Sequence, residues 1–316
     1  MENIIVIGGG AGGLELVTKL SRTLGKRRRA NITLVDRSRT HVWKPLLHEV
    51  AAGVIDKQSD GVEYGIHASR HGYEFQLGNV NKIDTTSQEI GLEPLLDDDG
   101  EVILPARTLS YGTLVVAVGS VSNDFGTPGV KDHAYFLDSL KQAERFHRAL
   151  LNQLLKRNHQ GDNESTLKVG IVGGGATGTE LAAQLHYIGD LAKSYGMPNM
   201  SADKLEITII EAGERILPAL PQRISFSARK ALNKIGIVVK ENTRVAEATE
   251  RGFVTAEGQL IEADLMVWAA GVKAPAFLQQ IPEFEKNRAG QVLANSFMQA
   301  QGHQNVYVLG DCCGIQ

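Results

Sequence analysis

Short apolar runs, separated by segments with apolar residues at helical spacing, recur along this chain of 316 residues. Residues 4–7 and 114–118 are apolar at every position, which is typical of strands buried on both faces of a parallel sheet. Residues 12–24 instead place leucine and valine three or four positions apart, as one face of an amphipathic helix does. Strands that alternate with such helices predict an α/β fold with parallel sheets and helical crossovers.

A glycine pattern of the form G-x-G-x-x-G follows the first apolar strand. Its glycines are Gly8, Gly10 and Gly13, with a helical segment after them and a later strand that ends in Asp36. Such glycines allow a tight turn, close approach of the backbone to a pyrophosphate, and close packing of helix on strand. The helix N-terminus adds free N–H groups, and the acid accepts hydrogen bonds from a ribose. This context predicts a dinucleotide site.

A second copy of the pattern follows a later apolar strand. Its glycines are Gly173, Gly175 and Gly178, and its acidic strand ends in Glu211. A carboxylate at this position repels the 2′-phosphate of NADPH, so we expect NADH, although the nearby Arg215 leaves that choice open. Two such units predict two dinucleotides in one chain, and two redox dinucleotides in contact imply electron transfer.

Composition excludes several classes of function. With 33 Lys and Arg against 36 Asp and Glu, the net charge is −3, and we expect no binding of nucleic acid. The only cysteines, Cys312 and Cys313, are adjacent, which predicts no disulfide framework and indicates a reducing compartment. We expect no metal site and no signal peptide, and the chain lacks the apolar run of about 18 residues that a membrane span needs.

Several longer segments resemble the type II NADH dehydrogenases, single-subunit flavoproteins that pass electrons from NADH to quinone. The most specific is HVWKPLLHEVAAG at 41–53, because it is not general to dinucleotide-binding proteins. The others are GGGAGGLE, ITLVDR, GSVSNDFGTPGV, GGGATGTELA, EAGERILPALP, DLMVWAAGVKAP and VYVLGDC. The resemblance covers essentially the whole chain. It implies two Rossmann-like dinucleotide-binding domains, with FAD in the first and NADH in the second.

The resemblance also implies roles for single residues. Glu180 matches a glutamate near the nicotinamide and the flavin, and it is the candidate catalytic residue. Lys44 and Pro45 match the loop beside the flavin ring. The other implied cofactor-binding residues are Gly8, Gly10, Gly13, Asp36, Val80, Ala117, Gly119 and Asp311 for FAD, and Gly173, Gly175, Gly178, Glu211 and Gly271 for NADH.

The expected division of the chain is a discontinuous FAD-binding domain of residues 1–136 and 286–316, a connecting segment of 137–165, and an NADH-binding domain of 166–285. Within the connecting segment, residues 138–157 have the pattern of an amphipathic helix. Residues 158–165 are polar and contain glycine, so we expect a linker there.

The implied function is hydride transfer from NADH to FAD, followed by transfer of two electrons to a membrane quinone without ion pumping. Members of the family continue beyond the Gly310-Asp311 motif into a quinone motif and amphipathic helices that dock on a membrane. We therefore expect quinone and a membrane surface on the cytoplasmic side as partners through residues beyond Gln316, with a homodimer left open. Two alternatives remain: a related flavoprotein reductase with a protein or soluble acceptor, and a non-catalytic NADH-sensing flavoprotein.

Overall fold

The apolar run near the N-terminus forms strand β1 (Glu2–Ile7), the central strand of a five-stranded parallel sheet in the computed structural model. The sheet has the order β22-β11-β1-β2-β5, and its other strands are β2 (Ala30–Asp36), β5 (Glu74–Leu77), β11 (Thr113–Val116) and β22 (Val306–Val308). Numbered along the chain, this is the order 3-2-1-4-5 of a dinucleotide-binding fold. The structure describes residues 1–54, 61–160, 166–194, 196–197 and 204–315.

From Ile4 to Ile7, both faces of β1 are buried, which explains why these four residues are all apolar. Alternate residues face two different hydrophobic clusters. In one of them, Val17 of helix α1 (Ala11–Leu20) packs against the sheet, and a π-helical turn (Ser21–Gly25) continues that helix. The helix predicted at 12–24 is confirmed, with a wider last turn.

The chain divides by its internal contacts into two units, which are described separately. Unit 1 comprises Met1–Trp43, Asp60–Val121 and Lys273–Gln316, and unit 2 comprises Lys44–Ser59 and Ser122–Val272. The chain enters unit 2 for the second time within strand β12 (Val121–Ser122), and it returns to unit 1 within strand β20 (Val272–Lys273). The FAD-binding and NADH-binding domains predicted from the sequence have bounds that differ from those of these two units, and that division stays a prediction.

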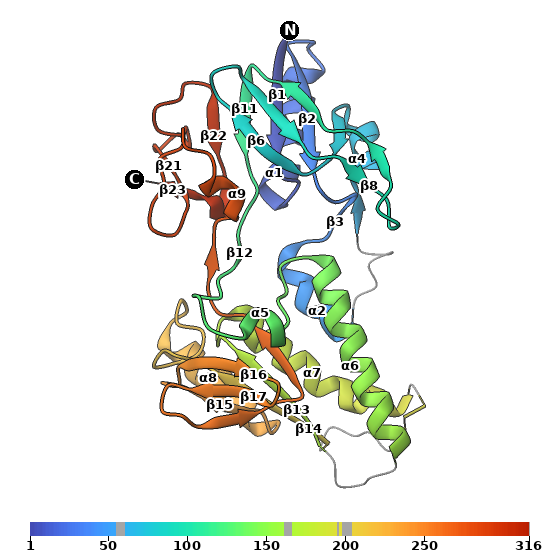
Figure 1. Ribbon diagram of the computed structural model, residues 1–316, viewed down its shortest axis with the longest axis vertical. Coiled ribbons are helices and arrows are strands. Elements are labelled where there is room, and N and C mark those ends of the chain that lie inside the picture. Colours follow the sequence, from blue (N-terminus) through green and yellow to red (C-terminus); the bar gives the residue numbers. More distant parts are fainter. Residues whose placement is uncertain (55–60, 161–165, 195, 198–203, 316) are drawn as a thin grey trace. The chain divides into compact units, whose positions relative to one another are not determined.

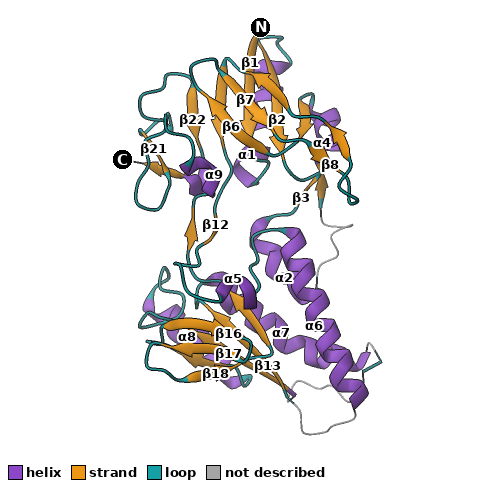
Figure 2. Cartoon of the chain, in the orientation of Figure 1, coloured by secondary structure: helices purple, strands orange, loops and turns teal. Residues whose placement is uncertain are grey.

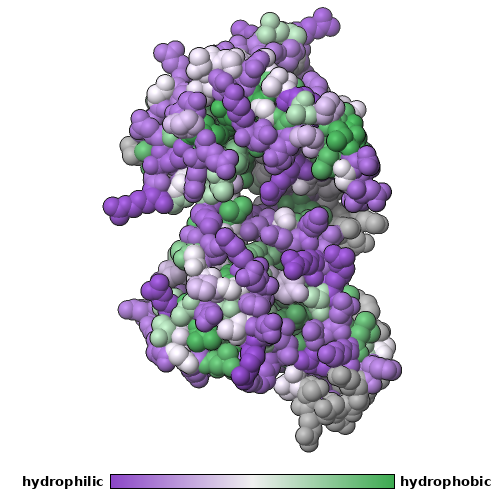
Figure 3. Space-filling model, in the orientation of Figure 1, coloured by the Kyte–Doolittle hydropathy of each residue, from purple (hydrophilic) through white to green (hydrophobic). Residues whose placement is uncertain are grey.

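Smaller elements complete unit 1 (Figure 1). They are the antiparallel sheet of β6 (Val80–Asp84), β7 (Glu89–Leu92) and β10 (Arg107–Ser110), the hairpin of β8 (Leu95–Leu96) and β9 (Val102–Leu104), the paired strands β3 (Thr40–His41) with β4 (Val62–Glu63) and β21 (Val292–Ala294) with β23 (Cys313–Ile315), the helices α4 (Tyr64–His71) and α9 (Ala276–Gln279), and a 3-10 turn at Gly310–Cys312. The β8–β9 hairpin exposes four large apolar side chains, Leu96, Val102, Ile103 and Leu104. Figure 3 shows green surface over this part of unit 1, within a mostly hydrophilic face.

Unit 2 repeats the plan of unit 1. Its parallel sheet has the order β15-β14-β13-β19, with β13 (Leu167–Val172), β14 (Leu205–Ile210), β15 (Val238–Lys240) and β19 (Leu265–Trp268). An antiparallel sheet of β16 (Val245–Thr249), β17 (Gly252–Thr255) and β18 (Leu260–Glu262) is inserted between the third and fourth parallel strands. The sheet of β6, β7 and β10 has the same place in unit 1, so the internal repeat extends beyond the glycine turns.

Helices α6 and α7 are the longest in the described part of unit 2 (Figure 2). The α-helices in the described residues of this unit are α2 (Leu47–Ala52), α5 (Val130–His133), α6 (Leu140–Gln160), α7 (Ala176–Ser194) and α8 (Gln222–Lys234). Helix α6 confirms the helix predicted at 138–157 and extends it by three residues into the predicted linker at 158–165, of which 161–165 lie outside the described residues. Helix α2 packs against α6 and α7. No helix in the described ranges is long and apolar enough to cross a membrane.

Candidate functional site

The first glycine turn joins β1 to α1 at the carboxyl end of the unit 1 sheet. Gly8 has a φ of +99°, and a Cβ there would overlap the backbone of Ala117. A Cβ on Gly13 would overlap the carbonyl oxygen of Gly8. At Gly10 the φ is an ordinary −61°, no protein atom lies within 4 Å of the Cβ position, and no side chain caps the helix. The protein itself does not require glycine there, so the open space fits a ligand at the helix N-terminus.

The second glycine turn, between β13 and α7 in unit 2, has the same geometry. Gly173 has a φ of +109°, and a Cβ there would press on the backbone of Ala269. A Cβ on Gly178 would overlap the carbonyl oxygen of Gly173, whereas the Cβ position of Gly175 is again open. Both turns thus combine two glycines that internal packing requires with one that leaves room for a phosphate.

The two predicted ribose acids make the same contacts in their units. Asp36 accepts a hydrogen bond from the Gly9 amide at 2.7 Å, and Glu211 accepts one from the Gly174 amide at 2.6 Å. In each case the other carboxylate oxygen accepts the amide two residues further along the chain, at 2.7 Å. Each oxygen keeps a lone pair for another donor, so each acid is oriented by the backbone and can still bind a ribose hydroxyl.

Each turn also has a support that the sequence did not reveal. In unit 1, the hydroxyl of Tyr64 on α4 donates to the carbonyl of Gly9 at 2.6 Å, and burial together with the Asp36 charge raises the pKa of Tyr64. In unit 2, the Leu217 amide donates to the carbonyl of Gly174 at 2.6 Å. Neither donor has a characteristic sequence signal, because each comes from a separate segment.

Four of the remaining predicted FAD residues belong to unit 1. Val80 and Ala117 are buried in unit 1, and Gly119 there has a φ of +67° with open space at its Cβ position. Asp311, also in unit 1, accepts a hydrogen bond from the hydroxyl of Ser120 at 2.7 Å.

The predicted flavin-loop residues belong to the other unit. Lys44 and Pro45 are exposed on the 3-10 turn before α2, and the Nζ atom of Lys44 lies 3.5 Å from Asp138. Asp138 in turn accepts the Ser122 amide at 2.9 Å. This loop is therefore anchored within unit 2.

Two further contacts in unit 2 concern the predicted NADH site. Gly271 has a φ of +63°, and the ring of Phe125 occupies the space that a Cβ would need. Arg215, which left NADPH open, donates from its two terminal nitrogens to the carbonyls of Pro218 and Leu220, both at 2.8 Å. Its guanidinium is thus bound to the backbone of its own loop.

Glu180, the candidate catalytic residue, has a partner that the sequence did not predict. The Nδ1 atom of His48, on α2, lies 3.6 Å from the Oε2 atom of Glu180 on α7. The His48 side chain is 7% exposed, whereas that of Glu180 is 54% exposed. The pair joins a buried ring to a carboxylate that solvent or a ligand can reach, and both residues belong to unit 2.

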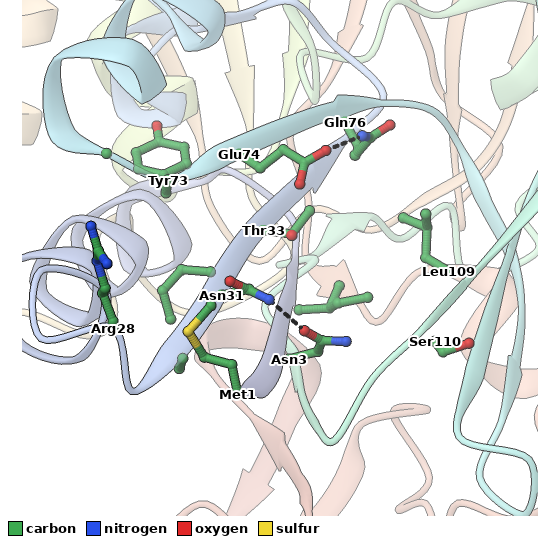
Figure 4. Close-up of a pocket in the computed structure, with 15 residues that line it drawn as sticks. Met1, Asn3, Arg28, Asn31, Thr33, Tyr73, Glu74, Gln76, Leu109 and Ser110 are labelled. Atoms are coloured by element: carbon green, nitrogen blue, oxygen red, sulfur yellow. Dashed lines mark hydrogen bonds between the residues drawn. The ribbon is translucent and has the colours of Figure 1, made fainter.

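A pocket in unit 1 lies at the other end of the sheet, around the amino ends of β1, β2 and β5 (Figure 4). Polar side chains line part of it, including Asn3 and Asn31, which are joined by a hydrogen bond of 3.0 Å. Dinucleotides bind at the carboxyl ends of the strands in such sheets. This pocket is therefore separate from the first glycine turn.

Neither cysteine forms a disulfide. Cys312 is buried, and burial raises the pKa of its thiol to about 11. Among the residues with described positions, no group of three or more His, Cys, Asp or Glu side chains could hold a metal ion.

Comparison with known proteins gives the family. The sequence profile of the pyridine nucleotide-disulphide oxidoreductases matches residues 2–316. A type II NADH:quinone oxidoreductase from Haemophilus influenzae is 40% identical over 329 residues, which cover all of this chain and 74% of that protein. The chain belongs to the type II NADH:quinone oxidoreductases. It is thus an FAD-dependent oxidoreductase of the NADH dehydrogenase type, with FAD as cofactor and NADH as substrate.

Other similar proteins agree with this family. A type II NADH:quinone oxidoreductase from Staphylococcus aureus (strain bovine RF122 / ET3-1) is 29% identical over 320 residues, 98% of this chain and 74% of that protein. The NDH2 structure of Plasmodium falciparum in complex with NADH has a TM-score of 0.84 at 23% identity. It shows the same fold, and the structural match covers all of the present chain and 65% of the Plasmodium chain.

Proposed function

We propose that this chain binds FAD at the first glycine turn and NADH at the second, and that it transfers electrons from NADH to a quinone. The observation that carries the proposal is the duplicated turn, with its open glycine and its backbone-held acid in both units. FAD, when bound, supplies the hydride-accepting and electron-transferring chemistry. The protein supplies binding, orientation and charge.

Each part of the turns has a role in this proposal. The amides at the start of α1 and α7 bind the pyrophosphates, and Asp36 and Glu211 bind the ribose hydroxyls. Glu180, two residues after the last glycine of the second turn, contacts the nicotinamide side of the substrate. Lys44, Pro45 and Asp311 contribute to the flavin side.

NADH is the proposed substrate rather than NADPH. Glu211 carries a negative charge at the ribose position, and its orientation is fixed by two backbone amides. Arg215, the nearest candidate for a 2′-phosphate, already donates to two carbonyls. A 2′-phosphate would therefore meet the Glu211 carboxylate, while the Arg215 guanidinium is already bound to backbone carbonyls.

The proposed acceptor is a membrane quinone, and the proposed reaction pumps no ion. The support is the similarity to relatives that are named NADH:quinone oxidoreductases, of whose length this chain covers 74%. Because a quinone with an isoprenoid tail partitions into lipid, the protein would meet it at a membrane surface, proposed to be the cytoplasmic one.

The optical spectrum of the purified protein tests the proposal. We expect bound FAD, loss of its visible absorption band when NADH is added without oxygen, and recovery of that band when a soluble quinone follows. A protein that retains no FAD, or whose FAD does not respond to NADH, would contradict it. A faster response to a ferredoxin than to the quinone would favour the reductase alternative.

A further inference from the structure

We propose that His48 is a positioning residue that fixes the carboxylate of Glu180 beside the second glycine turn. This inference rests on the proposed function, because Glu180 is the residue that contacts the substrate in it. His48 itself is buried, so it acts through Glu180 rather than on the substrate.

The position of His48 is set by the packing of α2. This short helix lies against α6 and α7, and five of its six residues are buried. It ends at Gly53, whose φ of +76° closes the helix, and the ring of His147 on α6 occupies the space beside that glycine. The Nδ1 atom of His147 lies 3.3 Å from the carbonyl of Ala51. Helix α6 therefore holds the end of α2, and α2 has little freedom to move His48.

The Nδ1 atom of His48 has the carboxylate of Glu180 as its candidate hydrogen-bond partner. It is buried without a hydrogen bond, and the Oε2 atom of Glu180 lies 3.6 Å away. Buried polar nitrogens in proteins nearly always find a partner. A shift of about half an ångström by the Glu180 side chain brings the two atoms into hydrogen-bond distance. Such a bond to a carboxylate is stronger than one between neutral groups.

Other titratable groups around the ring do not compete for Nδ1. The Nε2 atom faces Glu49, whose Oε1 atom lies 3.9 Å away and whose side chain is partly exposed. His147, from α6, is directed to the backbone of α2. The ring thus has one carboxylate on each side, and Nδ1 is the side that belongs to Glu180.

The benefit is preorganisation. A half-exposed glutamate on a helix surface otherwise samples several rotamers, and ordering it when the substrate binds weakens binding. A fixed His48 restricts Glu180 before NADH arrives. Loss of the contact is therefore expected to lower kcat/KM for NADH by about tenfold, the size of one charge-assisted hydrogen bond.

The first test uses NMR on the purified protein without NADH, with histidine labelled by ¹⁵N. Glu180→Gln should move the Nδ1 resonance of His48, whereas Glu49→Gln should act mainly on Nε2. Both acids are at least partly exposed, so neither variant is expected to unfold the protein. An unchanged Nδ1 resonance in Glu180→Gln would overturn the proposal.

The second test compares replacements of His48 that differ in where they place a donor. Asn puts an amide nitrogen near the position of Nδ1, Gln puts one near Nε2, and Leu has none. We expect His48→Asn to keep kcat/KM for NADH within about threefold, and His48→Gln and His48→Leu to lose about tenfold. In a Glu180→Ala background, which leaves no side-chain acceptor at this position, His48→Leu should cause no further loss.

These results distinguish the positioning role of His48 from the proposed function of the protein. Equal losses in all three His48 variants, or a full further loss in the double variant, would overturn the positioning role while NADH oxidation stands. Failure of the unaltered protein to oxidise NADH would instead contradict the proposed function, and the NMR comparison would still decide whether His48 and Glu180 interact.

Discussion

Asp36 and Glu211 occupy equivalent positions in the two units and bind equivalent backbone amides. A carboxylate whose two oxygens each accept an amide hydrogen bond is held in one orientation. The Glu211 side chain is one methylene longer than that of Asp36, but both accept a hydrogen bond from the equivalent amide of their turn. What distinguishes them is the ligand proposed for each unit.

The charge of Glu211 can be tested through cofactor selectivity. Glu211→Gln keeps an amide-accepting oxygen and removes the charge that repels a 2′-phosphate. We expect the ratio of kcat/KM for NADPH to that for NADH to rise by about tenfold, measured in steady state at low salt. Asp36→Asn is the matched control in unit 1 and should weaken FAD retention without changing that ratio. An unaltered ratio in Glu211→Gln would argue against a ribose role for this acid.

Tyr64 gives a second test at the level of one atom. Tyr64→Phe removes only the hydroxyl that donates to the Gly9 carbonyl, which leaves a buried acceptor unpaired. We expect a loss of about 1 kcal/mol in the free energy of unfolding and a lower FAD content after purification. Tyr73→Phe, which removes a hydroxyl bonded to His67 instead, should keep its FAD. Equal FAD content in both variants would exclude a role for Tyr64 in the turn.

The Cys312 thiol gives a prediction on pH. Burial raises the pKa of this thiol from 9.0 to about 11, so the folded protein holds the proton more tightly than the unfolded chain. The stability that this contributes is complete below pH 9 and is lost as the pH rises from 9 to 11. We expect a decline of about 2 kcal/mol in the free energy of unfolding over that range, measured in denaturant. The decline should be smaller by this amount in Cys312→Ala.

Among the elements, the two strand–turn–helix segments determine the fold and carry the proposed ligand sites. Within each turn, the three glycines serve different purposes. Two of them are required because other backbone atoms occupy the space that a Cβ would need, and the third faces open space. Substitution of one or the other should therefore separate folding from binding.

Gly10→Ala and Gly13→Ala form the matched pair that tests this separation. Gly13→Ala drives a Cβ into the carbonyl of Gly8, and we expect it to cost several kcal/mol or prevent folding. Gly10→Ala meets no protein atom, so its cost should stay below about 1 kcal/mol while FAD binding is lost. Thermal unfolding and flavin content measure the two effects. Retention of FAD by Gly10→Ala would show that the pyrophosphate does not approach this turn.

Local elements were predictable because their signals lie within short segments. The strand, glycine turn and helix at each site follow from adjacent residues, and so does the amphipathic helix at 138–157. The π-helical end of α1 was not predictable, because a wide turn has no distinctive pattern of apolar residues. The extension of α6 to Gln160 was missed because its last residues are polar and were interpreted as linker.

At the scale of the whole molecule, the contacts that support the site join distant parts of the sequence. His48 and Glu180, or Tyr64 and Gly9, meet only after the chain has folded. Periodicity and motifs carry no information on such pairs. The sequence therefore predicted the glycines and acids of the turns, whereas the residues that hold them in place had to be found in the structure.

The two units should respond to their ligands separately, which hydrogen exchange can show. FAD is expected to slow amide exchange at residues 8–13 and NADH at residues 173–178, because a ligand stabilises the amides that bind it. Gly175→Ala should abolish the NADH effect and leave the FAD effect unchanged. Protection of only one turn by both nucleotides would contradict the assignment of two sites.

The strand order of unit 1 has a consequence for synthesis of the chain. Strand β22 (Val306–Val308) pairs with β11 (Thr113–Val116), although all of unit 2 except its first segment lies between them in the sequence. On the ribosome, the first unit to begin is thus the last to be completed, and β11 remains an unpaired edge while unit 2 is translated. During that interval the nascent chain exposes the unpaired edge of β11, which is prone to aggregation, and we expect chaperones to bind the chain at this stage.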